Sequence, residues 1–258
     1  MAGRMDDMAL LELAFDLALR AGDAIMEVRA RGFATIRKAD HSPVTEADHA
    51  AEAIIAAGLR AAAPDFPVVA EEEIAAGHVP DRADAFWLVD PLDGTREFVA
   101  GGTDFAVCIG LVRDGRPALG VIGVPADSEL FGGIVGVGAW MRNAAGTRAI
   151  RARAAPPEGL HVVASRRHGD AATLSAFVAG RKIARVTNVG SALKFCRMAE
   201  GVADLYPRFG RTMEWDTAAG QALLEAAGGQ VLVAQTGLAL SYGKPGWDNP
   251  DFYCIGAA

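Results

Sequence analysis

Cysteine is scarce in this chain of 258 residues, with three cysteines that lie far apart in the sequence. An odd and sparse count does not form a disulfide framework, and the sequence has no Cys-x-x-Cys pair that would suggest zinc. Cys108, Cys196 and Cys254 therefore indicate a reducing cytoplasm.

Long hydrophobic runs are also missing. No apolar segment approaches the roughly 18 residues that a membrane-spanning helix needs. The N-terminal segment carries Asp6, Asp7, Glu12 and Asp16 among apolar side chains, which argues against a signal peptide. We expect a cytoplasmic protein without an integral membrane segment, either free or peripheral to the inner membrane.

Positive charge is in the minority, with 25 Lys and Arg against 32 Asp and Glu and a net charge of −7. A protein that follows a nucleic-acid backbone needs a basic face, so nucleic acid is not an expected partner.

Hydrophobic residues make up 51% of the chain, enough for a sizeable core, and a charged fraction of 22% argues against long disorder.

Residues 1–155 form the first predicted half. Apolar residues recur at helical spacing from 8 to 28, and an Ala-rich helix is expected over 45–60. Short apolar or alternating runs predict strands at 34–38, 68–70, 86–89, 105–112, 119–124, 131–135 and 139–142. Two helices followed mainly by strands are typical of an α+β arrangement.

Residues 156–258 form the second predicted half, which follows a Pro-containing linker at 154–159. Strands and helices alternate here, which favours an α/β arrangement. The expected strands are 161–165, 183–187, 204–208 and 231–233, and the expected helices are 170–178, 191–200 and 216–227.

Two carboxylates at the end of a predicted buried strand carry the most chemical information. The apolar run 86–89 leads directly into Asp90-Pro91-Leu92-Asp93-Gly94-Thr95. Carboxylates at such a place are costly to desolvate and need cations, and Mg²⁺ prefers hard oxygen ligands. The pair suits a two-metal site for phosphoryl transfer. A turn whose Asp side chains cap backbone amides has the same spacing.

Two further acidic segments complete the pattern. Glu71-Glu72-Glu73 follows the strand expected at 68–70, and Trp215-Asp216-Thr217 opens the helix expected at 216–227. Taken singly, the first is also a favourable acidic helix start, and Asp216 is also an N-cap.

The three segments together, from about residue 38 to the end of the chain, resemble the inositol monophosphatase superfamily. The resemblance implies a layered α+β and α/β sandwich (αβαβα) with the site in the cleft between the halves. It also implies a phosphomonoesterase that uses two or three Mg²⁺ ions. The metal ligands implied are Glu71, Asp90, the Leu92 carbonyl, Asp93 and Asp216. Glu72 and Thr95 would orient the attacking water, and Asp48 with Lys38 would flank a third metal or the water network.

Within the superfamily, four stretches are similar to the 3'(2'),5'-bisphosphate nucleotidases: 38–48, 87–98, 193–196 and 205–210. The implied substrate is adenosine 3',5'-bisphosphate, a by-product of sulfate assimilation, which is hydrolysed to AMP and phosphate. Arg208 stands where inositol phosphatases carry a glutamate, and arginine suits a second phosphate. The implied substrate-binding residues are Gly94, Thr95, Ser165, His168, Ser191, Lys194 and Arg208.

Other functions stay open at this point. The same metal site would serve an inositol monophosphatase or a histidinol-phosphate phosphatase, and Ser191-Ala192 departs from the two serines usual in the nucleotidases. A catalytically silent metal- or lithium-binding regulator is a third hypothesis, disfavoured because the carboxylates and Thr95 are intact. A homodimer is compatible with the resemblance.

Overall fold

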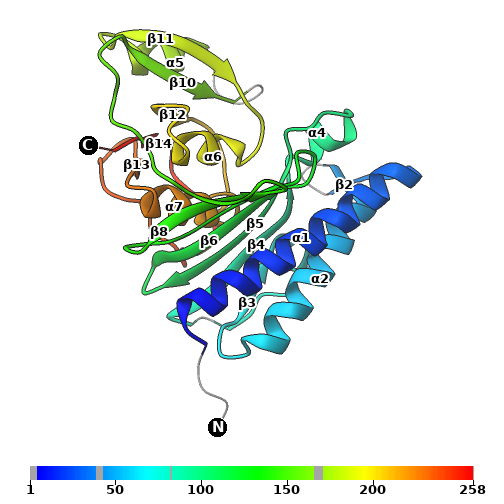
Figure 1. Ribbon diagram of the computed structural model, residues 1–258. Coiled ribbons are helices and arrows are strands. Elements are labelled where there is room, and N and C mark those ends of the chain that lie inside the picture. Colours follow the sequence, from blue (N-terminus) through cyan, green and yellow to red (C-terminus); the bar gives the residue numbers. More distant parts are fainter. Residues whose placement is uncertain (1–4, 39–42, 82, 166–170, 258) are drawn as a thin grey trace.

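The computed structural model describes residues 5–38, 43–81, 83–165 and 171–257. The chain folds into five layers, helices, sheet, helices, sheet and helix (Figure 1). This arrangement confirms the expected αβαβα sandwich. No helix in the described ranges is both long and apolar enough to cross a bilayer, and the three cysteines are buried thiols.

Two long helices form the first layer. α1 (Asp7–Arg31) begins where the Asp6 side chain accepts a hydrogen bond from the Ala9 N–H, and α2 (Glu46–Ala62) begins at a capping box formed by Thr45 and Asp48. Such caps satisfy N–H groups that a helix leaves unpaired. The apolar faces of both helices lie on one face of a seven-stranded sheet (Figure 1).

The seven-stranded sheet has its strands in sequence order, antiparallel except for the first pair. It contains β3 (Val68–Ala70), β4 (Ala85–Asp93), β5 (Ala106–Arg113), β6 (Arg116–Val124), β7 (Glu129–Ile134), β8 (Gly138–Asn143) and β9 (Gly146–Ile150). Because β3 and β4 are parallel, Glu71, which follows β3, and Asp90 to Asp93, which end β4, lie at the same edge of the sheet.

Two helices fill the layer between the sheets, α6 (Leu193–Ala199) and α7 (Ala218–Ala226). α7 lies close to the first sheet because β5 and β6 present glycines to it. A Cβ on Gly110 would stand 2.7 Å from the Ala219 nitrogen, and one on Gly120 would stand 2.5 Å from the Ala219 oxygen. Glycine is required at both positions for this close approach.

The second sheet has the order β11-β10-β12-β14-β13. Its strands are β10 (Leu160–Ala164), β11 (Ile183–Asn188), β12 (Leu205–Arg208), β13 (Gln230–Val233) and β14 (Phe252–Ile255). α5 (Ala171–Val178) forms the outer layer, where the Phe177 ring lies 5.3 Å from that of Tyr253. The two sheets and α7 share one hydrophobic cluster. The division near residue 155 stays a prediction.

Several short elements lie near the site. β1 (Thr35–Arg37) is the strand expected at 34–38, shortened at both ends, and α3 (Glu71–Ala75) is the acidic helix start offered as an alternative. The elements that were not expected are β2 (Pro43–Thr45), α4 (Thr95–Val99) and the 3₁₀ turn η1 (Glu214–Asp216). The helix expected at 216–227 begins instead at Ala218, because Asp216 belongs to η1. Asp216 is therefore not the N-cap of that helix.

Candidate active site

β4 ends in the Asp90–Thr95 motif, where the pairing with β5 is interrupted between Asp90 and Asp93. The Asp90 carboxylate accepts a hydrogen bond from the Leu92 N–H at 3.0 Å. Gly94 has φ +96° and directly precedes α4. A side chain at Gly94 would be strained at this φ, and its Cβ would stand 2.8 Å from the Asp104 carbonyl oxygen.

Asp48 joins the start of α2 to this motif. One of its carboxylate oxygens accepts the Thr45 N–H and hydroxyl, at 2.7 and 2.8 Å. The other accepts the Thr95 hydroxyl at 3.0 Å, and the Thr95 oxygen is also 3.0 Å from the Leu92 carbonyl oxygen. The cap of α2 therefore also fixes Thr95.

Glu71 and Glu72 open α3, and their carboxylates share one cation. Lys38 Nζ lies 2.7 Å from the Glu71 carboxylate and 2.5 Å from that of Glu72. Burial alone would lower the pKa of Lys38, but the two carboxylates outweigh burial and raise it. Lys38 therefore stays charged beside these acids.

The second half of the chain contributes Ser191 and Asp216. The Ser191 hydroxyl and the Ala192 N–H both donate to the Asp93 carboxylate, at 2.9 and 2.5 Å. The Asp216 carboxylate accepts the Met213 N–H at 2.9 Å, across the η1 turn. Both contacts hold carboxylates at the junction of the two sheets.

These carboxylates raise one another's pKa values. Burial, followed by repulsion from Glu71, Asp93 and Asp216, raises the pKa of Asp90 well above its ordinary value. Burial and then repulsion from Asp93 and Glu71 raise the pKa of Asp216 to about 8. The pKa of Glu71 is raised mainly by burial, although Lys38 opposes this. Acids from both halves therefore face one another.

The donor set fits divalent magnesium. Carboxylate and carbonyl oxygens are the ligands that Mg²⁺ prefers, and a divalent cation offsets the repulsion that raises the pKa values of Asp90 and Asp216. Within the described ranges, no three acidic, histidine or cysteine side chains meet closely enough to form a ready-made metal site. Instead, the carboxylate oxygens accept hydrogen bonds from Lys38, from the Ser191 hydroxyl and from backbone N–H groups.

A cavity of about 440 Å³ opens beside the carboxylates. Its lining includes acidic side chains and also Arg208, Arg211 and the rings of Phe195, Tyr206 and Trp215. Of the residues expected at the site, those that line the cavity are Glu71, Asp93, Gly94, Thr95, Ser165, Ser191, Lys194, Arg208 and Asp216. The hydrogen bonds and ion pairs described above connect the lining residues to four more of the expected set, Asp48, Glu72, Asp90 and Leu92. His168 lies outside the described residues.

The two expected substrate-binding cations differ in their surroundings. Arg208 Nη2 donates to the Arg211 carbonyl at 3.1 Å, and its guanidinium has further donors. Lys194 is buried and donates to the carbonyls of Val189 and Ser191, at 3.2 and 2.6 Å. Burial lowers the pKa of Lys194 to about 8. Arg208 is therefore the better placed of the two to bind an anion in the cavity.

Sequence reasoning missed three residues that hold the site, and Glu52 is the first. Ala70 stands at the N-cap of α3 and has no capping side chain. Glu52, from α2, supplies the missing acceptor, because its carboxylate accepts the N–H groups of Glu72 and Glu73. Its position four residues after Asp48 places both on one face of the helix, which is a signal that the sequence contains.

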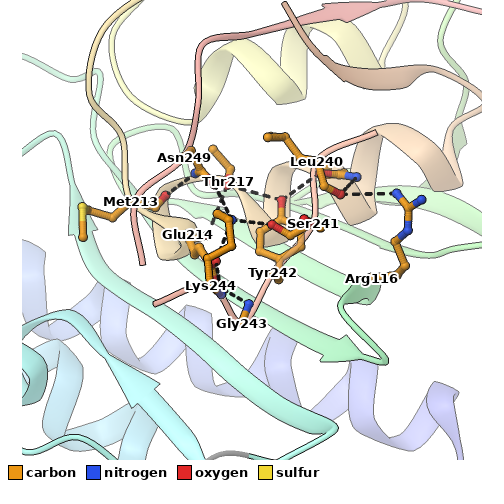
Figure 2. A network of polar contacts seen from close by, with 11 residues as sticks. Arg116, Met213, Glu214, Thr217, Leu240, Ser241, Tyr242, Gly243, Lys244 and Asn249 are labelled. Atoms are coloured by element: carbon orange, nitrogen blue, oxygen red, sulfur yellow. Dashed lines mark hydrogen bonds and ion pairs between the residues drawn. The ribbon is translucent and has the colours of Figure 1, made fainter. Parts of the chain in front are cut away.

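Glu214 and Asn249 are the other two. They belong to a polar network that links the residues around η1 to the segment 242–249 (Figure 2). Glu214 adjoins the Trp-Asp motif, but nothing in the sequence indicates its partners. Asn249 lies 33 positions after Asp216, in a stretch without regular secondary structure. Local patterns therefore give no signal for it.

Comparisons with known proteins show which family the chain resembles over nearly its whole length. The model of the inositol monophosphatase family matches residues 6–258. The 3'(2'),5'-bisphosphate nucleotidase CysQ of Shigella flexneri is 44% identical over 86% of this chain and 89% of that protein. CysQ of Bacteroides thetaiotaomicron superimposes with a TM-score of 0.81 at 33% identity, over 98% of both chains. An inositol monophosphatase from Zymomonas mobilis gives 0.80 at 27% identity, over 98% of this chain and 95% of that one.

Proposed function

Since this chain belongs to the inositol monophosphatase family, we propose that it hydrolyses 3'(2'),5'-bisphosphate nucleotides, such as adenosine 3',5'-bisphosphate, to AMP and phosphate. The observation that carries the proposal is the cavity that joins the carboxylates to buried Arg208. One part offers ligands for metal ions that would bind the scissile phosphate, and the other offers a guanidinium for a second phosphate. The similarity to proteins named bisphosphate nucleotidases supports the same substrate class.

Magnesium is the proposed cofactor, with two or three ions. The proposed ligands are Glu71, Asp90, the Leu92 carbonyl, Asp93 and Asp216. When bound, the ions supply positive charge that stabilises the phosphoryl group and makes water acidic enough to attack at neutral pH. No serine or cysteine nucleophile is then needed.

The chain's own residues orient the reactants. Thr95 is fixed by the Asp48 carboxylate, so its hydroxyl oxygen holds one position at the edge of the cavity. Glu72 is fixed by Lys38 and through its N–H by Glu52. Together, Thr95 and Glu72 would orient the attacking water, and the Glu72 carboxylate would accept its proton. The backbone N–H groups of Gly94 and Thr95 would bind phosphate oxygens at the start of α4.

Substrate selection would depend on the cationic, aromatic and hydroxyl side chains that line the cavity. Arg208 would bind the second phosphate, and the aromatic rings of Phe195 and Tyr206 would contact the nucleoside. Ser165 and Ser191 are proposed as further substrate contacts, and His168 as a contact from outside the described residues. Lys194 lines the same cavity, where its charge would favour an anionic substrate.

The test measures phosphate release from adenosine 3',5'-bisphosphate, inositol 1-phosphate and histidinol phosphate, each with Mg²⁺ and with EDTA. We expect kcat/KM for the bisphosphate to exceed that for either monoester, and activity to disappear in EDTA. Preference for a monoester would overturn the substrate assignment while leaving the metal site. Undiminished activity in EDTA would overturn the metal site as well.

Three further features remain proposals. They are the division into halves at residue 155, a homodimer, and a cytoplasmic location with or without contact to the inner membrane. Sedimentation of the purified chain would test dimerisation, and fractionation of cells would test location. The two halves, expressed separately, would test the division, because a shared core predicts that neither folds alone.

A further inference from the structure

The segment 242–249 wraps around the turn that carries Asp216. Its backbone binds the turn twice, because the Glu214 N–H donates to the Trp247 carbonyl at 2.8 Å and the Asn249 N–H donates to the Thr212 carbonyl at 2.9 Å. Met213 pairs with Asp248 in an isolated antiparallel bridge. The turn is therefore fixed to a segment more than 25 residues later in the chain.

Asn249 holds both ends of the turn with one side-chain amide. Its Nδ2 donates to the Met213 carbonyl at 2.8 Å and to the Thr217 hydroxyl at 2.9 Å (Figure 2). Asp216 lies between these two residues, and its own carboxylate accepts the Met213 N–H. One buried amide thus links the two ends of the turn, in addition to the backbone hydrogen bonds within the turn.

Glu214 fixes the same turn from the other side. Its carboxylate is fully buried and accepts the Gly243 and Lys244 N–H groups at 2.7 and 2.9 Å (Figure 2). Lys244 Nζ adds an ion pair at 2.6 Å. A buried charge is tolerated only when it is paired in this way, so the turn cannot move without breaking the network.

We propose that Asn249 and Glu214 are positioning residues that set the direction of the Asp216 carboxylate and thereby the affinity of the site for its metal. This inference rests on the proposed role of Asp216 as a metal ligand. Neither side chain lines the cavity, so both act through the turn. Groups that orient metal ligands typically contribute about 10- to 100-fold to metal affinity.

The test is calorimetric titration of Mn²⁺ and Mg²⁺ into the chain without substrate. Asn249→Ala removes both donors to the turn, and we expect the metal dissociation constant to rise about 10-fold. Glu214→Gln keeps the shape of the side chain but presents an N–H where the carboxylate accepts one. It should also raise the metal dissociation constant. If Asn249→Ala fails to fold, Glu214→Gln decides the question.

Tyr242→Phe is the matched control. It breaks buried hydrogen bonds from the same segment to Thr217 and Gln221, at 3.3 and 2.8 Å, but leaves the contacts to Met213 and Glu214. We expect it to lower Tm while metal affinity stays within about twofold. Wild-type metal affinity in folded Asn249→Ala or Glu214→Gln would overturn the inference, as would an equal loss in Tyr242→Phe. Metal binding by a wild type that prefers inositol 1-phosphate would overturn only the substrate proposal.

Discussion

Glu52 and Glu72, twenty residues apart, meet where the Glu52 carboxylate accepts the Glu72 N–H at 2.7 Å. The second oxygen of Glu52 accepts the Glu73 N–H at 2.9 Å. A side chain of α2 therefore caps α3 from outside, and α3 carries the proposed metal ligand Glu71 and the proposed base Glu72. Asp48, one turn earlier on α2, fixes Thr95. One helix thus places two parts of the site relative to each other.

The first prediction concerns this cap. Glu52→Leu leaves two N–H groups of α3 without their acceptor, and we expect the free energy of unfolding to fall by about 1–3 kcal/mol for each. The kcat of the protein that remains folded should also fall, because Glu71 and Glu72 lose their fixed position. Chemical denaturation and kcat are the measurements. Arg60→Met is the control, since it removes the exposed ion pair with Glu73 on the same short helix.

A second prediction follows from the charge of Glu52. Burial, partly offset by the hydrogen bond from the Glu72 N–H, raises the pKa of Glu52 to about 7 from an ordinary 4.5. A raised pKa means that the folded state binds the proton more tightly than the unfolded state. The resulting stabilisation is complete below pH 4.5 and is lost as the pH rises through 7.

Glu52→Gln should remove that pH dependence. At about 1.4 kcal/mol per pKa unit, reduced because the carboxylate is partly screened by solvent, the free energy of unfolding of the wild type should fall by on the order of 2 kcal/mol, relative to Glu52→Gln, between pH 4.5 and 8. Urea denaturation at several pH values in EDTA measures the difference. Parallel curves for the two proteins would show that Glu52 does not titrate in this range.

The layered fold could be predicted from the sequence because its evidence is local. Apolar spacing located α1 and α2, and the run before Asp90 located β4. The site could be predicted only through motif order, since the contact of Lys38 with Glu71 joins residues 33 positions apart and has no local signature. For the same reason Asn249 could not be predicted, whereas Glu52 lies four residues after Asp48 on one helix face and could have been. For Asp216, the alternative of an N-cap for the helix at 216–227 is wrong, because its carboxylate accepts the Met213 N–H within a 3₁₀ turn.

The third prediction separates the roles of Arg208 and Lys194, two of the cations that line the cavity. Arg208→Met should lower kcat/KM for adenosine 3',5'-bisphosphate by about 10- to 100-fold, the value of a charge-assisted hydrogen bond, and leave adenosine 3'-monophosphate nearly unchanged. Lys194→Met should lower kcat for both substrates by the same factor. Its ammonium holds the Ser191 carbonyl, and the Ser191 hydroxyl holds Asp93.

Steady-state kinetics on the two nucleotides distinguishes these outcomes. A selective loss of the bisphosphate in Lys194→Met would mean that Lys194 binds the second phosphate directly. Equal losses on both nucleotides in Arg208→Met would mean that Arg208 does not. Arg211→Met is the matched control, because Arg211 lines the same cavity but is exposed and paired with Asp248.

The last prediction is that Asp90→Asn changes stability and activity in opposite directions. Asp90 is buried, and burial and three neighbouring carboxylates raise its pKa. Its charged form therefore costs free energy in the fold when no divalent cation is present. The amide removes this cost and keeps the side-chain oxygen that accepts the Leu92 N–H. In EDTA at pH 8, Tm of Asp90→Asn should equal or exceed that of the wild type.

Addition of Mg²⁺ should raise Tm of the wild type, by mass action on the folded state, and raise Tm of the variant much less. Phosphate release by the variant should fall by at least about 100-fold, because a neutral oxygen holds a divalent cation poorly. A variant that is less stable in EDTA yet stabilised by Mg²⁺ as strongly as the wild type would show that Asp90 has a structural role and no part in metal binding.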